Sequence, residues 1–186
     1  MLRLFAALPV PGPVALALRP LQKNLSGASW RPVENFHITL CFYGDVETAR
    51  AHDLDDLLGE IDRPVFDLSI EGMGWFGRRE PRAVWARIRE SDELRALASQ
   101  CEKAARRLAI PLERRPYTPH ITLAYLHGTP LEDARAWTET HQTFRAGPFP
   151  ATHFHLFSSR PGRPGGPTRY EAEADYPLTD YGGELF

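Results

Sequence analysis

The sequence predicts an α+β fold of two pseudo-symmetric lobes, each with an antiparallel sheet and flanking helices, around a central cleft. Three observations lead to this prediction: short β-rich segments alternate with amphipathic ones, neighbouring strands suggest hairpins, and one stretch of sequence occurs twice. The 186 residues suffice for one hydrophobic core. We therefore expect residues 1–186 to form a single domain whose two lobes share the cleft.

Seven short segments rich in β-branched and aromatic residues are expected to form strands. They are residues 2–8, 37–43, 65–71, 83–89, 120–126, 152–158 and 169–175. Four segments with apolar residues three or four positions apart are expected to form helices. They are residues 13–25, 45–58, 91–108 and 132–143. Pro13 suits the first turn of the first helix, and Asp45 and Ser91 are expected to cap the second and third.

One segment of the chain occurs twice. Residues 33–44 read VENFHITLCFYG, and residues 115–128 read RPYTPHITLAYLHG. In both copies a polar turn precedes the strand and a helical pattern follows it, which gives an order of approximately βαβαββ followed by βαβαββ. A repeat of this size predicts two lobes related by a pseudo-twofold axis, with the two copies facing each other across the cleft.

Each copy places a histidine and a threonine on one face of its strand. Because alternate side chains of a strand share a face, His37 lies beside Thr39 while Ile38 faces the core, and His120 and Thr122 are arranged in the same way. Near neutral pH one imidazole can accept a proton while another donates one, and phosphodiester cleavage needs both steps. Threonine hydroxyls can donate to the non-bridging oxygens. We therefore predict two catalytic histidines and two phosphate-binding threonines, with neither a metal nor a cofactor.

Composition restricts the partners. The net charge of -2 excludes a uniformly cationic surface for long nucleic acid, so any contact with RNA must be local. The chain has no apolar run long enough to cross a bilayer, and its short apolar start does not resemble a signal peptide. We expect a soluble, cytoplasmic monomer.

The two cysteines and the other histidines are expected to be mostly structural. Cys41 and Cys101 lack metal-binding spacing and are expected to be buried thiols. His153 and His155 lie two positions apart on a predicted strand and could approach a metal ion. However, the sequence offers no third ligand at a suitable spacing.

With these residues identified, the chain resembles the 2H phosphoesterase superfamily and, within it, the bacterial and archaeal RNA 2′,3′-cyclic phosphodiesterases once called 2′-5′ RNA ligases. The likeness covers residues 3–9, 30–44, 119–124, 155–159, 170 and 176–178. It implies hydrolysis of a terminal 2′,3′-cyclic phosphate to a 2′-phosphate, on RNA ends or small cyclic nucleotides. It also implies that His37 protonates O3′ and that His120 activates water, although the residues by themselves leave these two roles interchangeable.

One position departs from the family pattern. Family members usually carry an arginine directly after the alanine of the second motif, and this chain has Tyr125 there. The hydroxyl and ring face of Tyr125 make it a possible substrate contact, although strict strand alternation would turn it toward the core. The missing charge is expected from Arg114 or Arg115, which are also possible substrate contacts; the alternative is a lower affinity for phosphate. Aromatic side chains are candidates for stacking on the terminal base. They are Phe5, Trp30, Phe42 and Tyr43.

Three other functions stay open at this stage. One is RNA 2′-5′ ligation, which is chemically the reverse reaction. A second is a nucleotide- or RNA-binding module without catalysis, and a third is a purely structural role. The proline- and glycine-rich residues 161–167 are expected to form a hairpin loop that could touch substrate.

Overall fold

Two antiparallel sheets form the framework of the computed structural model, which describes residues 1–162 and 168–180. The four-stranded sheet has the order β3-β1-β8-β9. Its strands are β1 (Leu2–Pro9), β3 (His37–Val46), β8 (His153–Arg160) and β9 (Arg169–Pro177). The five-stranded sheet has the order β2-β6-β5-β4-β7. Its strands are β2 (Ala28–Trp30), β4 (Phe66–Phe76), β5 (Ala83–Ile88), β6 (His120–Leu126) and β7 (Arg145–Ala151).

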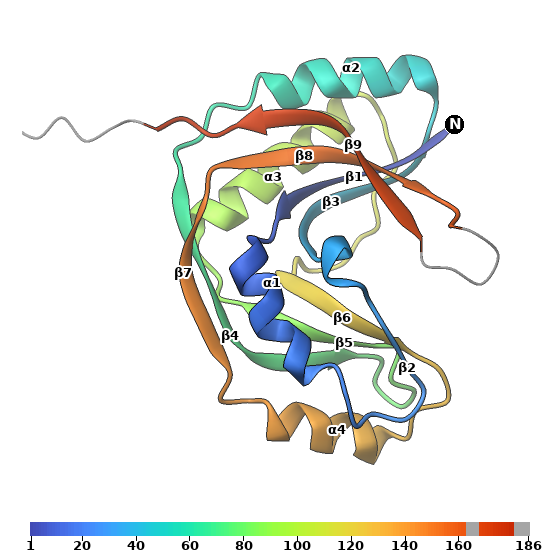
Figure 1. Ribbon diagram of the computed structural model, residues 1–186. Helices are drawn as coiled ribbons and strands as arrows, with labels where there is room; N and C mark the ends of the chain where they lie inside the picture. The colour runs from blue at the N-terminus through green and yellow to red at the C-terminus, as the bar shows by residue number, and fades with distance from the viewer. Residues whose placement is uncertain (163–167, 181–186) are drawn as a thin grey trace, which may run out of the picture.

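Helices lie on the outer sides of the sheets and between them (Figure 1). The helices are α1 (Gly12–Leu18), α2 (Thr48–Gly59), α3 (Asp92–Arg107) and α4 (Leu131–Thr140). Helices α2 and α3 contact β9 and β3 of the four-stranded sheet, and α4 contacts β4 of the other sheet. Helix α1 occupies the space between the sheets (Figure 1). The predicted α+β architecture of two antiparallel sheets with flanking helices is therefore confirmed.

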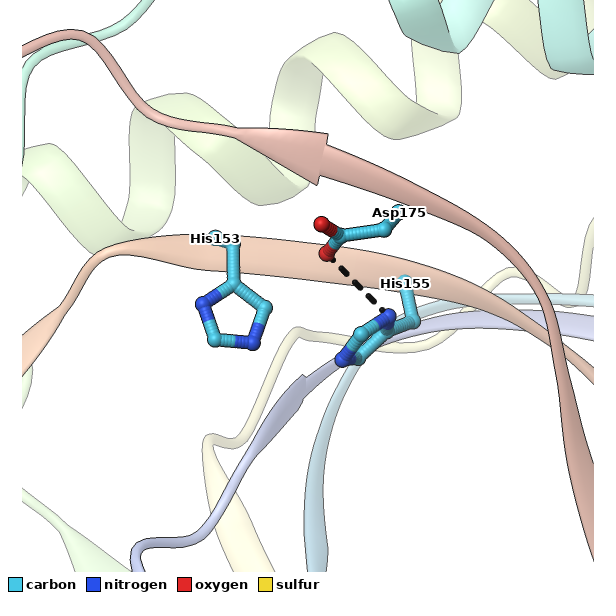
Figure 2. A group of neighbouring side chains, drawn as sticks. All are labelled: His153, His155 and Asp175. Carbon is cyan, nitrogen blue, oxygen red and sulfur yellow. Dashed lines mark ion pairs between the residues drawn. The ribbon is translucent and has the colours of Figure 1, made fainter.

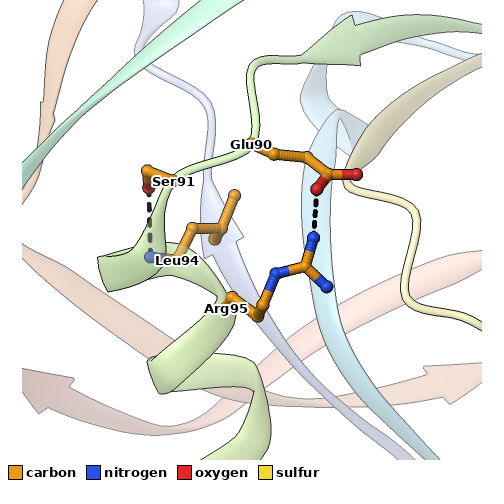
Figure 3. Close-up of polar contacts among 4 residues, drawn as sticks. All are labelled: Glu90, Ser91, Leu94 and Arg95. Atoms are coloured by element: carbon orange, nitrogen blue, oxygen red, sulfur yellow. Dashed lines mark hydrogen bonds and ion pairs between the residues drawn. The ribbon is translucent and has the colours of Figure 1, made fainter.

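Helix α3 begins as the sequence predicts. The side chain of Ser91 accepts a hydrogen bond from the backbone N–H of Leu94 at 3.2 Å, which satisfies one free donor of the first turn. Figure 3 shows this cap beside an ion pair between Arg95 and Glu90. Asp92 and Glu93 add negative charge at the helix N-terminus, where the helix dipole favours it.

Two expectations about helix ends are wrong. The first helix ends at Leu18 instead of residue 25, because Pro20 has no N–H to continue it and a 3₁₀ turn (Arg19–Leu21) follows. Asp45 does not cap the second helix, whose N-cap is Glu47. Instead, Asp45 lies in β3 opposite Arg3, and the two exposed side chains form an ion pair at 3.6 Å.

Two strands were not predicted. β7 contains Pro148 and Pro150, which weaken a strand pattern, and it is tolerated as the last strand of its sheet. β2 has only three residues, too few to give a periodic pattern, and pairs with β6. The position of β2 beside the second motif strand matters for the site.

One hydrophobic cluster joins the inner residues of both sheets and their helices. Cys41 and Cys101 are buried free thiols within it, as expected. Among the residues that the structure describes, no helix combines the length and the hydropathy needed to cross a membrane.

Candidate active site

Exposed and buried residues follow one another in the same order along the two motif strands. His37 and Thr39 of β3 are half-buried while Ile38 is fully buried, and the corresponding residues of β6 follow the same pattern. The predicted alternation therefore holds for the first four residues of each motif. Burial of the apolar residues fixes the direction of each histidine–threonine pair.

Both strands bulge at the same motif position. In β3 the register with β1 skips Leu40, and in β6 the register with β5 skips Leu123. An extra residue at a bulge reverses the alternation that follows it. Tyr125 is consequently 44% exposed, and the expectation that it points toward the core is wrong.

Both imidazoles are anchored through the same ring nitrogen. Nδ1 of His37 lies 2.7 Å from the carbonyl oxygen of Asn35, and Nδ1 of His120 lies 2.6 Å from that of Thr118. A carbonyl only accepts hydrogen bonds, so each Nδ1 carries the proton and donates it. Nε2 of each ring is therefore the atom that can accept or donate a proton during a reaction.

The two motifs lie close together. Strands β3 and β6 contact each other although they belong to different sheets, and the hydroxyl of Tyr117 donates to the backbone carbonyl of Thr39 at 3.0 Å. The charge of a protonated His120 acts on His37. Neither the Thr39 hydroxyl nor the Thr122 hydroxyl bonds to any other described residue, which leaves both free to donate to a ligand.

Aromatic rings enclose each histidine. Phe5 and Tyr170 lie with their ring centroids 4.9 and 5.2 Å from that of His37. Phe76 and Trp85 lie 4.9 and 5.7 Å from that of His120. Gly74 makes room for this second wall, because a Cβ there would lie 2.3 Å from the Trp85 ring.

Burial in these walls keeps both rings neutral in the free protein. It is the largest cause that lowers the pKa of His37 to about 4, and the charges of His120 and Arg31 act in the same direction. Burial also lowers the pKa of His120, with the charge of Arg115 adding to it. An anion bound between the rings would oppose both effects, so the site favours a negatively charged ligand.

Arg31 supplies a positive charge that was not predicted from the sequence. Its backbone N–H donates to the carbonyl of Leu123 at 2.8 Å, which places it beside the second motif. Its guanidinium carbon lies 5.4 Å from the ring centroid of Tyr125 and 5.8 Å from that of Tyr170. It also donates to the Tyr170 hydroxyl at 3.4 Å. Arg31 lies within the stretch that resembles the family, but no role was expected for it, because it directly follows β2, a strand too short to predict.

The other candidate contacts differ in how close they lie to the two histidines. Tyr43 is only 3% exposed and its hydroxyl donates to the carbonyl of Cys101, so its assignment as a substrate contact is corrected. Phe5 is buried but its ring touches His37. Arg114 and Arg115 are exposed, and only the charge of Arg115 acts on His120.

Two further stacking candidates, Trp30 and Phe42, contact other parts of the protein. Trp30 packs against Trp137 with the ring centroids 5.8 Å apart. Phe42 is exposed beneath the guanidinium of Arg3. Of the predicted loop at 161–167, residues 163–167 lie outside the described residues.

The fold and the paired motifs are those of a phosphoesterase. A crystal structure described as a phosphoesterase superposes with a TM-score of 0.78 at 26% identity, covering 96% of this chain and 99% of that one. Escherichia coli LigT complexed with 3′-AMP gives a TM-score of 0.77 at 27% identity, with the same coverage. Residues 10–163 match the family model of the 2′-5′ RNA ligase superfamily. The chain belongs to this family, which confirms the resemblance seen in the sequence.

Curated relatives carry the name RNA 2′,3′-cyclic phosphodiesterase. The one from Escherichia coli K12 is 32% identical over 152 residues, which are 80% of each chain. The one from Archaeoglobus fulgidus is 32% identical over 126 residues, 66% of this chain and 71% of the relative. The one from Geobacillus stearothermophilus is 32% identical over 127 residues, 64% of this chain but only 40% of the relative.

Proposed function

We propose that this protein hydrolyses the 2′,3′-cyclic phosphate of RNA ends or small nucleotides to a 2′-phosphate, using His37 and His120 as an acid–base pair without a metal ion. The observation that carries the proposal is the shared anchoring of the two rings. Each Nδ1–H is bound to a carbonyl two residues earlier, so each Nε2 is free for proton transfer. The names of the curated relatives and the nucleotide complex of the Escherichia coli neighbour support the same substrate class.

The reaction needs one proton removed and one delivered. Nε2 of neutral His120 accepts a proton from water as the water oxygen forms a bond to phosphorus. The bond from phosphorus to O3′ breaks, and protonated Nε2 of His37 donates its proton to that oxygen. The product carries a 2′-phosphate and a free 3′-hydroxyl. This division of roles follows the family resemblance.

The surrounding groups stabilise the charge that develops on phosphorus oxygens. The free hydroxyls of Thr39 and Thr122 donate to the non-bridging oxygens. Arg31 adds a permanent positive charge close to His37, in place of the arginine that the family usually carries at the position of Tyr125. A cyclic phosphate is an anion, so its binding raises the pKa of His37 and supplies the protonated acid that the free protein lacks at neutral pH.

The identity of the product tests the proposed function. Incubation of the purified protein with adenosine 2′,3′-cyclic phosphate in excess chelator is expected to yield adenosine 2′-phosphate alone, separated from its 3′ isomer by chromatography. The chelator should leave the rate unchanged because protons are moved only by side chains. Formation of the 3′ isomer, loss of turnover in chelator, or no product at all would contradict the proposal.

Ligation is the second candidate, favoured by the description of the matched family. It would use the same two histidines with their roles exchanged and a 5′-hydroxyl end in place of water. Joined products from an RNA with a cyclic-phosphate end and an RNA with a 5′-hydroxyl end would establish it.

A further inference from the structure

A second group of histidines lies on β8, away from the paired motifs. Alternation along this strand places His153, His155 and Phe157 on one half-buried face, while Phe154 and Leu156 are buried on the other. Asp175 of β9 is the direct partner of His155 in the register of the two strands. The sequence alone did not identify this third residue, because it lies 20 positions further along the chain.

The three side chains converge on one point. Nδ1 of His155 lies 3.3 Å from Oδ1 of Asp175, and the ring centroids of the two histidines are 4.9 Å apart. One potential ligand atom from each residue lies within 4.8 Å of the other two. Figure 2 shows both rings projecting to the same side of β8, with the carboxylate above them. Two ligands at about 2.0–2.1 Å from an ion are at most about 4.2 Å apart, so small side-chain rotations would close the site.

The hydrogen bonding of the group is incomplete in a way that an ion would complete. Nδ1 of His155 is buried and lies 3.3 Å from Oδ1 of Asp175 without the geometry of a hydrogen bond, and the side chain as a whole is 18% exposed. The hydroxyl of Thr152 lies 2.8 Å from Nδ1 of His153, which orients this ring and leaves its Nε2 as the nitrogen available to an ion.

We propose that His153, His155 and Asp175 bind one divalent transition-metal ion of the Zn²⁺ type, with water completing the coordination. Two imidazole nitrogens and one carboxylate oxygen suit such an ion, whereas Mg²⁺ and Ca²⁺ prefer oxygen ligands alone. The ion would tie β8 to β9 at the surface of the four-stranded sheet.

This site is separate from the proposed catalytic pair. The ring of Phe157 lies between them, 5.2 Å from the ring of His155 and 6.4 Å from that of His37 by ring centroids. The ion is therefore structural and takes no part in the proposed proton transfers.

Calorimetric titration of the full chain with Zn²⁺, together with its melting temperature, tests the proposal. We expect one ion per chain and a melting temperature that rises with Zn²⁺ concentration, because the ion binds only the folded state. Asp175→Asn and His155→Ala should each weaken binding at least about tenfold. His153→Ala provides a second ligand variant should His155→Ala fail to fold.

Two control variants separate this site from other histidines. His141→Ala removes a half-buried histidine at the end of α4, and His37→Ala removes one of the proposed catalytic pair. Both should bind Zn²⁺ like the unaltered chain. Absence of binding in the unaltered chain, binding that persists in the ligand variants, or binding abolished by His37→Ala would overturn the metal site. None of these results bears on turnover in chelator, so the proposed function stands or falls separately.

Discussion

Replacing His37 or His120 by alanine is expected to lower kcat for adenosine 2′,3′-cyclic phosphate by about 10²–10⁴-fold, because each variant loses one of the two proton transfers. The double variant should be little worse than the poorer single one, since the two groups act in the same step. His52→Ala, on the exposed face of α2, is the matched control and should retain full activity. Rates near that of the unaltered protein in either single variant, with folding verified by circular dichroism, would reject the acid–base pair.

A substrate with sulfur in place of O3′ separates the two roles. A thiolate leaves without help from an acid, because a thiol has a pKa of about 8.5, far below that of an alcohol. This substrate should therefore restore most of the rate of His37→Ala and little of that of His120→Ala. If the rate of His120→Ala were restored instead, His120 would be the acid and His37 the base.

Replacing Arg31 by leucine is expected to reduce kcat/KM by roughly 10–150-fold, the equivalent of about 1.5–3 kcal/mol for a charged hydrogen-bonding group. The guanidinium lies close to the rings of both Tyr125 and Tyr170, and its positive charge lowers the pKa of His37. Its removal should also raise the pKa of His37, because a nearby positive charge disfavours the protonated ring. A purely structural role for Arg31 would not move this pKa in a folded variant.

Arg3→Leu is the matched control for this experiment. The guanidinium carbon of Arg3 lies 5.2 Å from the ring centroid of Phe42, which occupies the place of Tyr125 in the first motif. Arg3 pairs instead with the carboxylate of Asp45, at 3.6 Å. Equal losses in Arg3→Leu and Arg31→Leu would show that the position of Arg31 has no special importance.

The orientation of the repeated motif was predictable because its apolar and its polar residues alternate, so that each kind occupies one face of the strand. Ile38 and Ile121 are apolar residues within strands, so the core had to lie on their side and the histidines on the other. The bulge was not predictable, since an inserted residue leaves no mark on the composition of the strand. Tyr125 was therefore expected on the wrong face.

Contacts across strands account for most of what the sequence could not reveal. Arg31 directly follows β2, which pairs with β6 in the sheet but lies about 90 residues earlier in the chain. Asp175 joins His155 through the register of β8 and β9. Neither neighbour can be inferred from spacing along the chain, because the register depends on how the whole sheet assembles.

The most direct test of the account is an NMR pH titration of the histidine rings, with and without adenosine 2′-phosphate. In the free protein we expect His37 to titrate near pH 4 and His120 below 6.5. The bound phosphate should raise both pKa values, because its negative charge favours the protonated rings. As adenosine 2′-phosphate is added at constant pH, the resonances of both rings should follow one saturation curve. A response from only one ring, or two different binding curves, would contradict the claim that the two histidines meet around the same phosphate.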